Sequence, residues 1–192
     1  KIWTSVMQQK IVIRKKALLN RKKKYFEISS HFFNPLIKLL KNQKKNTINT
    51  LSIYYPSNYE VNILKLFQQI IKIKIKIKIL LPVTKPKNQI NFVEWQYLDP
   101  LKVNEFGMLE PCLRSKPLVP DFMAVPLLAF DSDNNRLGYG KGFYDKFLNN
   151  KKKITTIGVA FSFQKYNKLP VSNLDVKLDY ILTEKGIKKW KY

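Results

Sequence analysis

The chain has 192 residues, enough to bury a substantial hydrophobic core, and carries a formal net charge of +23. Its single cysteine, Cys112, and single histidine, His31, exclude a disulfide framework, an all-cysteine metal site and a histidine-rich metal site. The low cysteine content, together with the lack of a bilayer-length apolar run or a secretory leader pattern, predicts a soluble, cytoplasmic protein without a membrane partner.

The excess of basic residues is typical of nucleic-acid-binding proteins. However, only four of the 36 basic residues are arginines, namely Arg14, Arg21, Arg114 and Arg136. Arginine is the residue that forms bidentate hydrogen bonds with phosphates and base edges. We therefore expect a generally solvated lysine surface and no specific nucleic-acid partner. A basic α/β protein that binds nucleic acid remains the alternative.

The first predicted elements are helical. A basic helix is expected over Met7–Ile28 and a second helix over Phe32–Leu40, followed by a polar loop over Lys41–Asn46. The whole chain is expected to form one domain, in which residues 1–45 are the helical N-terminal part and residues 48–188 the α/β core.

Strands and helices then alternate. β-branched and aromatic residues predict a strand over Ile48–Pro56, and a helix is expected over Val61–Ile71. The run IKIKIKIKI has the strand period of two and predicts a strand over Ile71–Ile79, particularly where it continues into IKILLPV, although a low-complexity repeat is the alternative. A short strand is predicted over Ile90–Trp95.

The second half continues the pattern after an irregular stretch at Asn104–Pro111. Apolar residues without alternation predict a buried strand over Asp121–Phe130. A helix is predicted over Phe143–Asn149, and strands over Ile154–Ser162 and Leu178–Thr183. This order predicts an α/β fold, a three-layer domain with a largely parallel open sheet flanked by helices and preceded by the basic helix.

A glycine-rich stretch, RLGYGKGFYDK, joins the buried strand to the following helix. It contains Gly138, Gly140 and Gly142, three of the chain's six glycines. A loop at the carboxyl end of a strand lies where open α/β sheets bind ligands, and its backbone N–H groups can converge on an anion that Lys141 also neutralises. On spacing alone, a tight turn whose glycines adopt positive φ explains the pattern equally well.

Three acidic residues follow this loop. Asp145 lies in the first turn of the predicted helix, where a carboxylate either stabilises the helix dipole or, beside bound phosphates, binds Mg²⁺. Either Asp175 or Asp179 could complete such a metal site.

The stretch DFMAVPLLAFDSDNNRLGYGKGFYDKFL resembles the signature of the 5-formyltetrahydrofolate cyclo-ligase family, also called 5,10-methenyltetrahydrofolate synthetases. YYPSNYEVN resembles the family's first strand and the glutamate after it, IKILLPV its second strand, and FGMLEP its Gly-Ile-x-Glu-Pro turn. GVAFSFQKYNKLPVSNLDVKLDYILTEKGI resembles the family's C-terminal part. The resemblance covers roughly Leu51 to Lys188, in a consistent order.

This resemblance implies an enzyme that uses ATP and Mg²⁺ to convert 5-formyltetrahydrofolate into 5,10-methenyltetrahydrofolate, ADP and phosphate. It implies that ATP phosphorylates the formyl oxygen and that N10 then attacks the activated carbon. The expected partner is a small-molecule folate, with or without a polyglutamate tail, and we expect a monomer.

The resemblance also implies roles for individual residues. ATP would be held by Arg14 and the loop, namely Arg136, Leu137, Gly138, Tyr139, Gly140, Lys141, Gly142, Phe143 and Tyr144. The folate would contact Tyr55, Glu60, Tyr139, Gly140, Lys141, Gly142 and Phe143. Lys141 and Tyr144 would be catalytic, and Asp145 and Asp175 would hold Mg²⁺.

Three positions depart from the family pattern. The family's N-terminal helix carries the pattern Lys-x-x-Leu-Arg near ATP. If Met7 and Gln8 are aligned with the Leu-Arg of this pattern, the arginine is absent from this chain. Lys10 or Arg14 would then substitute for it. Leu127 replaces a common glycine, and Tyr139 replaces a basic residue or methionine. A catalytically weak folate-binding relative is therefore a further alternative.

Overall fold

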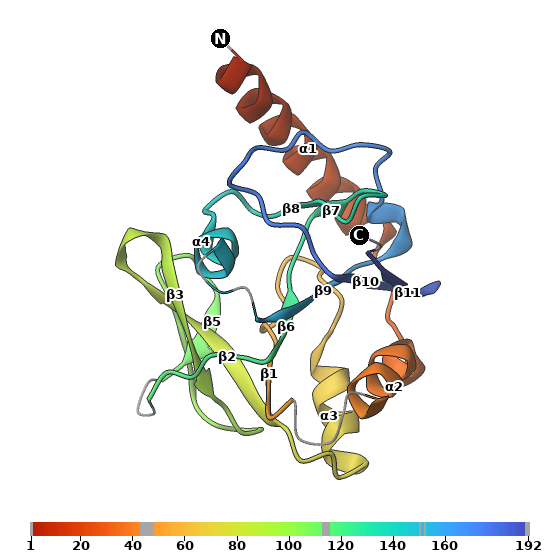
Figure 1. The fold of residues 1–192 in the computed structure, drawn as a ribbon, viewed down its shortest axis with the longest axis vertical. Helices are drawn as coiled ribbons and strands as arrows, with labels where there is room; N and C mark the ends of the chain where they lie inside the picture. Colours follow the sequence, from red (N-terminus) through yellow and green to blue (C-terminus); the bar gives the residue numbers. More distant parts are fainter. Residues whose placement is uncertain (1, 43–47, 113–115, 150, 152, 191–192) are drawn as a thin grey trace.

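The computed structural model describes residues 2–42, 48–112, 116–149, 151 and 153–190. Figure 1 shows a central sheet with helices beside it and the long helix α1 (Ile2–Lys24) across one end. Most of the loop predicted at Lys41–Asn46 lies outside the described residues. None of the helices in the described ranges is long and apolar enough to cross a membrane.

The main sheet has seven strands in the order β11-β10-β9-β6-β1-β2-β3. They are β1 (Thr50–Ser52), β2 (Lys78–Lys85), β3 (Gln89–Glu94), β6 (Phe122–Val125), β9 (Thr155–Val159), β10 (Tyr180–Thr183) and β11 (Gly186–Lys189). The pairs from β10 to β2 are parallel, whereas β3 and β11 pair antiparallel at the two edges. The predicted largely parallel sheet is confirmed.

The strand order reverses between β1 and β6. After β1 the chain adds β2 on one side, and after β6 it adds β9 and β10 on the other side. The loops that leave the carboxyl ends of β1 and β6 therefore diverge and open a crevice between them. In open α/β sheets ligands bind at this switch point.

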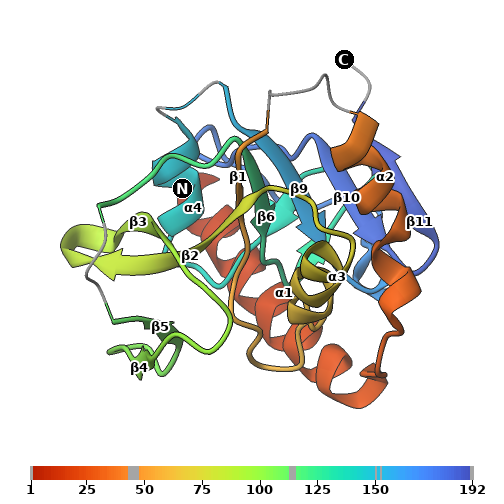
Figure 2. The ribbon, with the colours of Figure 1, turned by 90° about the horizontal axis from the view of Figure 1, so that it is seen from below.

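Helices cover both faces of the sheet (Figure 2). They are α2 (Asn34–Asn42), α3 (Leu64–Lys72) and α4 (Phe143–Asn149), with short 3₁₀ helices at Ser30–Phe33, Pro86–Asn88 and Ser162–Gln164. Because side chains alternate along a strand, Phe122 packs into the core under α2 and α3, whereas Met123 packs into the core under α4. The fold is thus the flanked α/β sheet that the sequence predicts.

Helix α1 buries two of its cations and exposes several of its apolar residues. Lys10, Ala17 and Arg21 are buried, at a spacing that keeps them on one face of the helix. Ile11 and Leu19 are 47% and 61% exposed. The helix was predicted, but the hydrophobic pattern alone would have oriented it with the wrong face inward.

The strand predicted over Ile71–Ile79 is wrong except at its last two residues. Helix α3 continues to Lys72, Lys74 adopts a positive φ of 53°, and β2 begins only at Lys78. The buried residues of α3 have helical spacing up to Ile70, and the tertiary contacts of this face override the local period of two.

Two small antiparallel ribbons were not predicted. Strands β4 (Leu101–Val103) and β5 (Leu109–Pro111) pair where an irregular stretch was expected. The strand predicted over Asp121–Phe130 ends at Val125, because Pro126 has no N–H to donate, and β7 (Ala129–Phe130) pairs separately with β8 (Arg136–Leu137).

Gly158, in β9, offers a test of the core packing. A Cβ at this position would lie 2.5 Å from Leu127 Cδ2 and 2.7 Å from Ile181 Cδ1. We expect Gly158→Ala to lower the free energy of unfolding by about 1–3 kcal/mol in urea denaturation, because the core must shift to accept the methyl group. Gly138→Ala is the control, since open space surrounds a Cβ there. Equal stability of both variants would contradict this packing.

Candidate functional site

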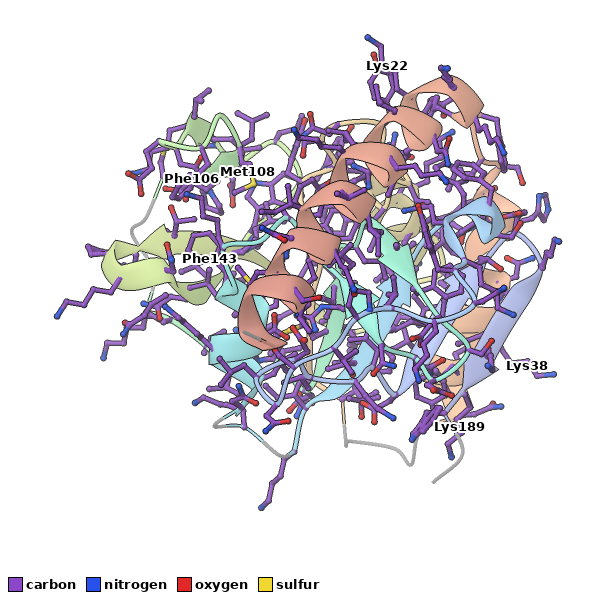
Figure 3. All side chains as sticks on the ribbon, turned by 90° about the horizontal axis from the view of Figure 1, so that it is seen from above. Lys22, Lys38, Phe106, Met108, Phe143 and Lys189 are labelled. Atoms are coloured by element: carbon purple, nitrogen blue, oxygen red, sulfur yellow. The ribbon has the colours of Figure 1, made fainter. Side chains whose placement is uncertain are left out.

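The candidate site lies in the crevice between β1 and β6. Four segments meet there: the loop that follows β1, the residues that follow β6, the glycine-rich loop at residues 138–142, and α1. The first two leave the carboxyl ends of sheet strands, the glycine-rich loop follows β8, and α1 crosses them, as Figure 3 shows from above.

A tight turn after β1 presents Glu60. Its backbone N–H bonds to the Ser57 carbonyl at 2.9 Å, and Asn58 and Tyr59 between them both adopt positive φ, 47° and 60°. Positive φ at a bulky residue such as Tyr59 is uncommon and is often found at functional sites. The Ser57 N–H donates to Glu60 Oε2 at 2.8 Å, which fixes the carboxylate against the turn.

Glu60 is linked to Arg21 through a tyrosine hydroxyl. Tyr139 donates to Glu60 Oε1 at 2.6 Å and accepts from Arg21 Nη2 at 2.5 Å. Arg21 is only 1% exposed, and it also donates to the carbonyls of Asn58, at 2.9 Å, and Leu127, at 3.1 Å. One guanidinium thus contacts three segments of the crevice.

Burial raises the pKa of Glu60, although the positive charge of Arg21 and the hydrogen bonds from Tyr139 and Ser57 act in the opposite direction. Burial also raises the pKa of Tyr139, with a further contribution from the charge of Glu60, so that its hydroxyl stays neutral and keeps its proton. The site therefore holds a buried carboxyl group whose protonation depends on its immediate partners.

The glycine-rich loop is held against α1. Arg14 Nε donates to the Gly138 carbonyl at 2.9 Å. Gly140 and Gly142 have φ values of 102° and 71°, and a Cβ on Gly140 would lie 3.1 Å from Arg14 Cζ. Positive φ explains two of the three predicted glycines, and close approach of Arg14 is a second reason for glycine at position 140.

Asp145 and Asp175 lie near each other at the far end of this loop. Asp145 Oδ1 accepts from the N–H of Val176, at 3.0 Å, and from Arg136 Nη1, at 2.9 Å. Asp175 Oδ2 accepts from Lys10 Nζ at 2.5 Å. Both carboxylates are therefore ion-paired with lysine or arginine side chains in the apo protein.

Asp179, the other acid considered, has a structural role. Its Oδ2 accepts from the N–H and hydroxyl of Thr156, at 2.7 and 2.9 Å, and so ties β10 to β9. Within the described residues, no three histidine, cysteine, aspartate or glutamate side chains gather as a metal site. A cation held by Asp145 and Asp175 would thus need further oxygen ligands from a bound molecule.

Burial acts to raise the pKa of Asp175, but the hydrogen bonds from Lys10 and Ser172 outweigh it and hold the pKa below its usual value. Arg14 interacts with the charge of Asp175, which offsets in part the lowering of the Arg14 pKa by burial. Asp175 is therefore an anion at neutral pH, close to Lys10 and Arg14.

Lys10 and Arg14, the expected substitutes for the family's arginine, both contact the candidate site. Met7 is 48% exposed, whereas Lys10 contacts Asp175 and Arg14 contacts the glycine-rich loop. The correspondence of these residues with the family's Lys-x-x-Leu-Arg pattern stays a prediction.

Aromatic residues border the loop on its outer side. The Phe106 ring packs edge-on against Phe143 with centroids 5.6 Å apart, and Lys141 Nζ lies 5.2 Å from the Phe106 centroid. Figure 3 shows Phe106 and Phe143 in the same part of the molecule. Tyr144 packs near Phe92, and its pKa is raised by burial first and by the charge of Glu60 second.

The structure brings Glu60, Tyr139 and Arg14 into one crevice and keeps Asp145 close to Asp175. Tyr55 is half-buried after β1, and Arg136 and Leu137 are buried in β8. Two residues of the site were missed. Arg21 could have been found from its spacing, because residues 10, 14, 17 and 21 share one face of a helix. Phe106 reaches the loop through the β4–β5 ribbon, which the sequence does not predict.

Comparisons with known proteins agree with this arrangement. A model described as the 5-formyltetrahydrofolate cyclo-ligase family matches residues 6–184. The relative of that name from Haemophilus influenzae is 38% identical over 112 residues, 54% of this chain and 60% of the relative, so the match spans less than two thirds of that protein. The Mycoplasma pneumoniae relative is 32% identical over 141 residues, 73% of this chain and 76% of the relative.

Two solved structures are similar over most of the chain. The 5,10-methenyltetrahydrofolate synthetase of Aquifex aeolicus has a TM-score of 0.74 and 30% identity, and the match covers 95% of this chain and 93% of that one. The synthetase of Mycoplasma pneumoniae has a TM-score of 0.67 and 26% identity, over 91% of this chain and 98% of that one. The match to most of the chain, in sequence and in fold, shows that this protein belongs to the 5-formyltetrahydrofolate cyclo-ligase family.

Proposed function

We propose that this protein catalyses the ATP- and Mg²⁺-dependent conversion of 5-formyltetrahydrofolate into 5,10-methenyltetrahydrofolate, with release of ADP and phosphate. The proposal rests on the match to this family and on the way the predicted site residues meet in one crevice. The glycine-rich loop contacts Glu60 through Tyr139 on one side and Arg14 on the other, and Arg14 interacts in turn with Asp175.

The ATP phosphates would bind between the glycine-rich loop and α1. Arg14 carries a full positive charge beside the Gly138 carbonyl, and Lys10 lies next to Asp175. The positive φ of Gly140 and Gly142 leaves backbone N–H groups free of side-chain obstruction on this loop. A polyanion bound there would neutralise the positive charges of Lys10 and Arg14, which pair with the Asp175 carboxylate and the Gly138 carbonyl.

Asp145 and Asp175 fit a magnesium ion, because Mg²⁺ is bound by one or two carboxylates together with phosphate oxygens and water. A bound Mg²⁺ would neutralise charge on the phosphates during transfer. Arg136 and Lys10, which pair with these carboxylates in the apo protein, would then share them with the ion.

The folate would occupy the Glu60 side. A cavity of about 340 Å³, the size of a small-molecule site, lies beside Glu60, and its lining includes Tyr25, Ser57 and Tyr59. Tyr55 is half-buried and precedes Glu60 in the same loop after β1, and Phe143 directly follows the glycine-rich loop. Aromatic rings of this kind can stack on a pterin.

The reaction needs positioning more than covalent chemistry from the protein. An amide-like formyl oxygen is a poor leaving group, and its phosphorylation makes it a phosphate that can leave when N10 attacks. The protein then contributes alignment of ATP with the formyl group and stabilisation of charge. In this proposal Lys141 neutralises charge on the transferred phosphoryl group, and the neutral hydroxyl of Tyr144 donates a hydrogen bond to it.

Incubation of the purified protein with ATP, Mg²⁺ and 5-formyltetrahydrofolate tests the function directly, through the absorbance of the methenyl product. Formation of product that depends on ATP supports the proposal. If ATP and the folate both bind but no product forms, the chain is a folate-binding relative without this activity. For the nucleic-acid alternative, Lys10 and Arg21 are buried and so unavailable, whereas Lys15, Lys16 and Lys22 to Lys24 of the same helix are exposed.

Asp145→Asn tests the metal assignment. We expect ATP-dependent turnover to fall by about a hundredfold or more, because the amide no longer offers a negative charge to Mg²⁺. The amide oxygen can still accept from the Val176 N–H, so circular dichroism should report an intact fold. The control is Asp133→Asn, which removes an exposed carboxylate. Full activity of Asp145→Asn would show that this carboxylate does not hold the metal.

Gly140→Ala and Lys141→Ala separate the backbone of the loop from its charge. A methyl group at position 140 meets the Arg14 guanidinium and strains a residue with φ of 102°, at a cost of about 1 kcal/mol or more. We expect Gly140→Ala to raise the KM for ATP at least tenfold. Lys141→Ala should lower kcat more than it raises this KM, since charge on the transferring oxygens changes toward the transition state. A normal KM for ATP in Gly140→Ala would show that the loop is a tight turn that does not bind ATP.

A further inference from the structure

The hydrogen bonds around Tyr139 have a defined direction. Arg21 has only donors, so the Tyr139 oxygen must accept from Arg21 Nη2. The hydroxyl proton is then donated to Glu60 Oε1, at 2.6 Å. Arg21 thus fixes which way the Tyr139 proton points.

Glu60 is arranged as an acceptor at both oxygens. Oε1 accepts from Tyr139, and Oε2 accepts from the Ser57 N–H at 2.8 Å. Each carboxylate oxygen has a second lone pair, so Glu60 can still accept from a substrate N–H in the neighbouring cavity. A protonated Glu60 carries its proton on one of these oxygens, where it would face a group that is itself the donor, which is unfavourable.

We propose that Arg21 is a positioning residue of this site: by holding the Tyr139 hydroxyl, it keeps Glu60 as a hydrogen-bond acceptor for an N–H group of the bound folate. This inference rests on the proposed function for the identity of the ligand. The acceptor state of Glu60 itself follows from the apo structure alone.

The charged and titratable groups that face Glu60 support the assignment. They are Arg21 from α1, Tyr54 after β1, Tyr139 from the glycine-rich loop, and Tyr144 from α4. Arg21 is the one cation among these groups, and burial raises the pKa of each of the three tyrosines. Without the Tyr139 bond, burial would raise the pKa of Glu60 further.

Tyr139 also links the two halves of the site. Its ring belongs to the loop on which ATP is proposed to bind, and its hydroxyl contacts the residue proposed to bind folate. Tyr139→Phe keeps the ring and removes the hydroxyl that bonds to Arg21 and Glu60. Arg21→Lys, which keeps the charge but loses the planar fork, is its companion.

The pKa of Glu60 can be measured without any enzymatic activity. The chain has six glutamates, so ¹³C-glutamate labelling gives a resolvable set of carboxyl signals, and Glu60→Gln assigns the one of interest. We expect the Glu60 pKa to rise by about one unit in both Tyr139→Phe and Arg21→Lys. Tyr166→Phe is the matched control, because the Tyr166 hydroxyl is buried without a hydrogen-bond partner among the described residues.

In the assay, the same two variants should move the acid limb of kcat/KM for the folate to higher pH by a matching amount. An unchanged Glu60 pKa in Tyr139→Phe would overturn the inference. The two proposals can also fail separately. If the wild-type protein formed no methenyl product but the Glu60 pKa still rose in the two variants, the proposed reaction would be wrong, and Arg21 would still control the protonation of Glu60.

Discussion

The buried guanidinium of Arg21 constrains the organisation of the whole site. Removing a charge from water costs several kcal/mol unless partners compensate it. Here the compensation comes from two backbone carbonyls, of Asn58 and Leu127, and from Glu60 through the Tyr139 hydroxyl. None of these partners comes from α1 itself, so the helix can dock only when the crevice between β1 and β6 has formed. The docking of α1 and the shape of the site are thus one event.

This constraint explains why α1 is inverted with respect to its hydrophobic pattern. A helix on a sheet face buries apolar residues, but α1 crosses the carboxyl ends of strands, where backbone carbonyls and acidic side chains face it. Lys10 meets Asp175 and Arg21 meets carbonyls, whereas Ile11 and Leu19 remain exposed. Lys10 and Arg21 are therefore buried because polar partners face them, while the other lysines of the helix remain exposed.

The sequence predicts most of the sheet because its strands carry β-branched and apolar residues and are bounded by turns; the helix Phe143–Asn149 was predicted with its observed bounds. The ribbons β4–β5 and β7–β8 were missed because strands of two or three residues have no period of their own. The glycine-rich loop was identified from its own residues, whereas Glu60 came from a family resemblance. Arg21 was missed because exposed lysines follow it in the basic helix, and only its spacing from Lys10 and Ala17 marks the buried face.

Arg14 and Arg21 lie seven residues apart, close to two turns of α1, and hold the glycine-rich loop in two different ways. Arg14 binds the backbone at Gly138, and Arg21 binds the side chain of the next residue, Tyr139. Glycines lose more conformational entropy on ordering than other residues, so such a loop would be disordered without external contacts. The rigid helix supplies these contacts before any ligand binds. The loop can therefore offer N–H groups in a fixed geometry, and the entropy of ordering is lost on folding rather than on binding.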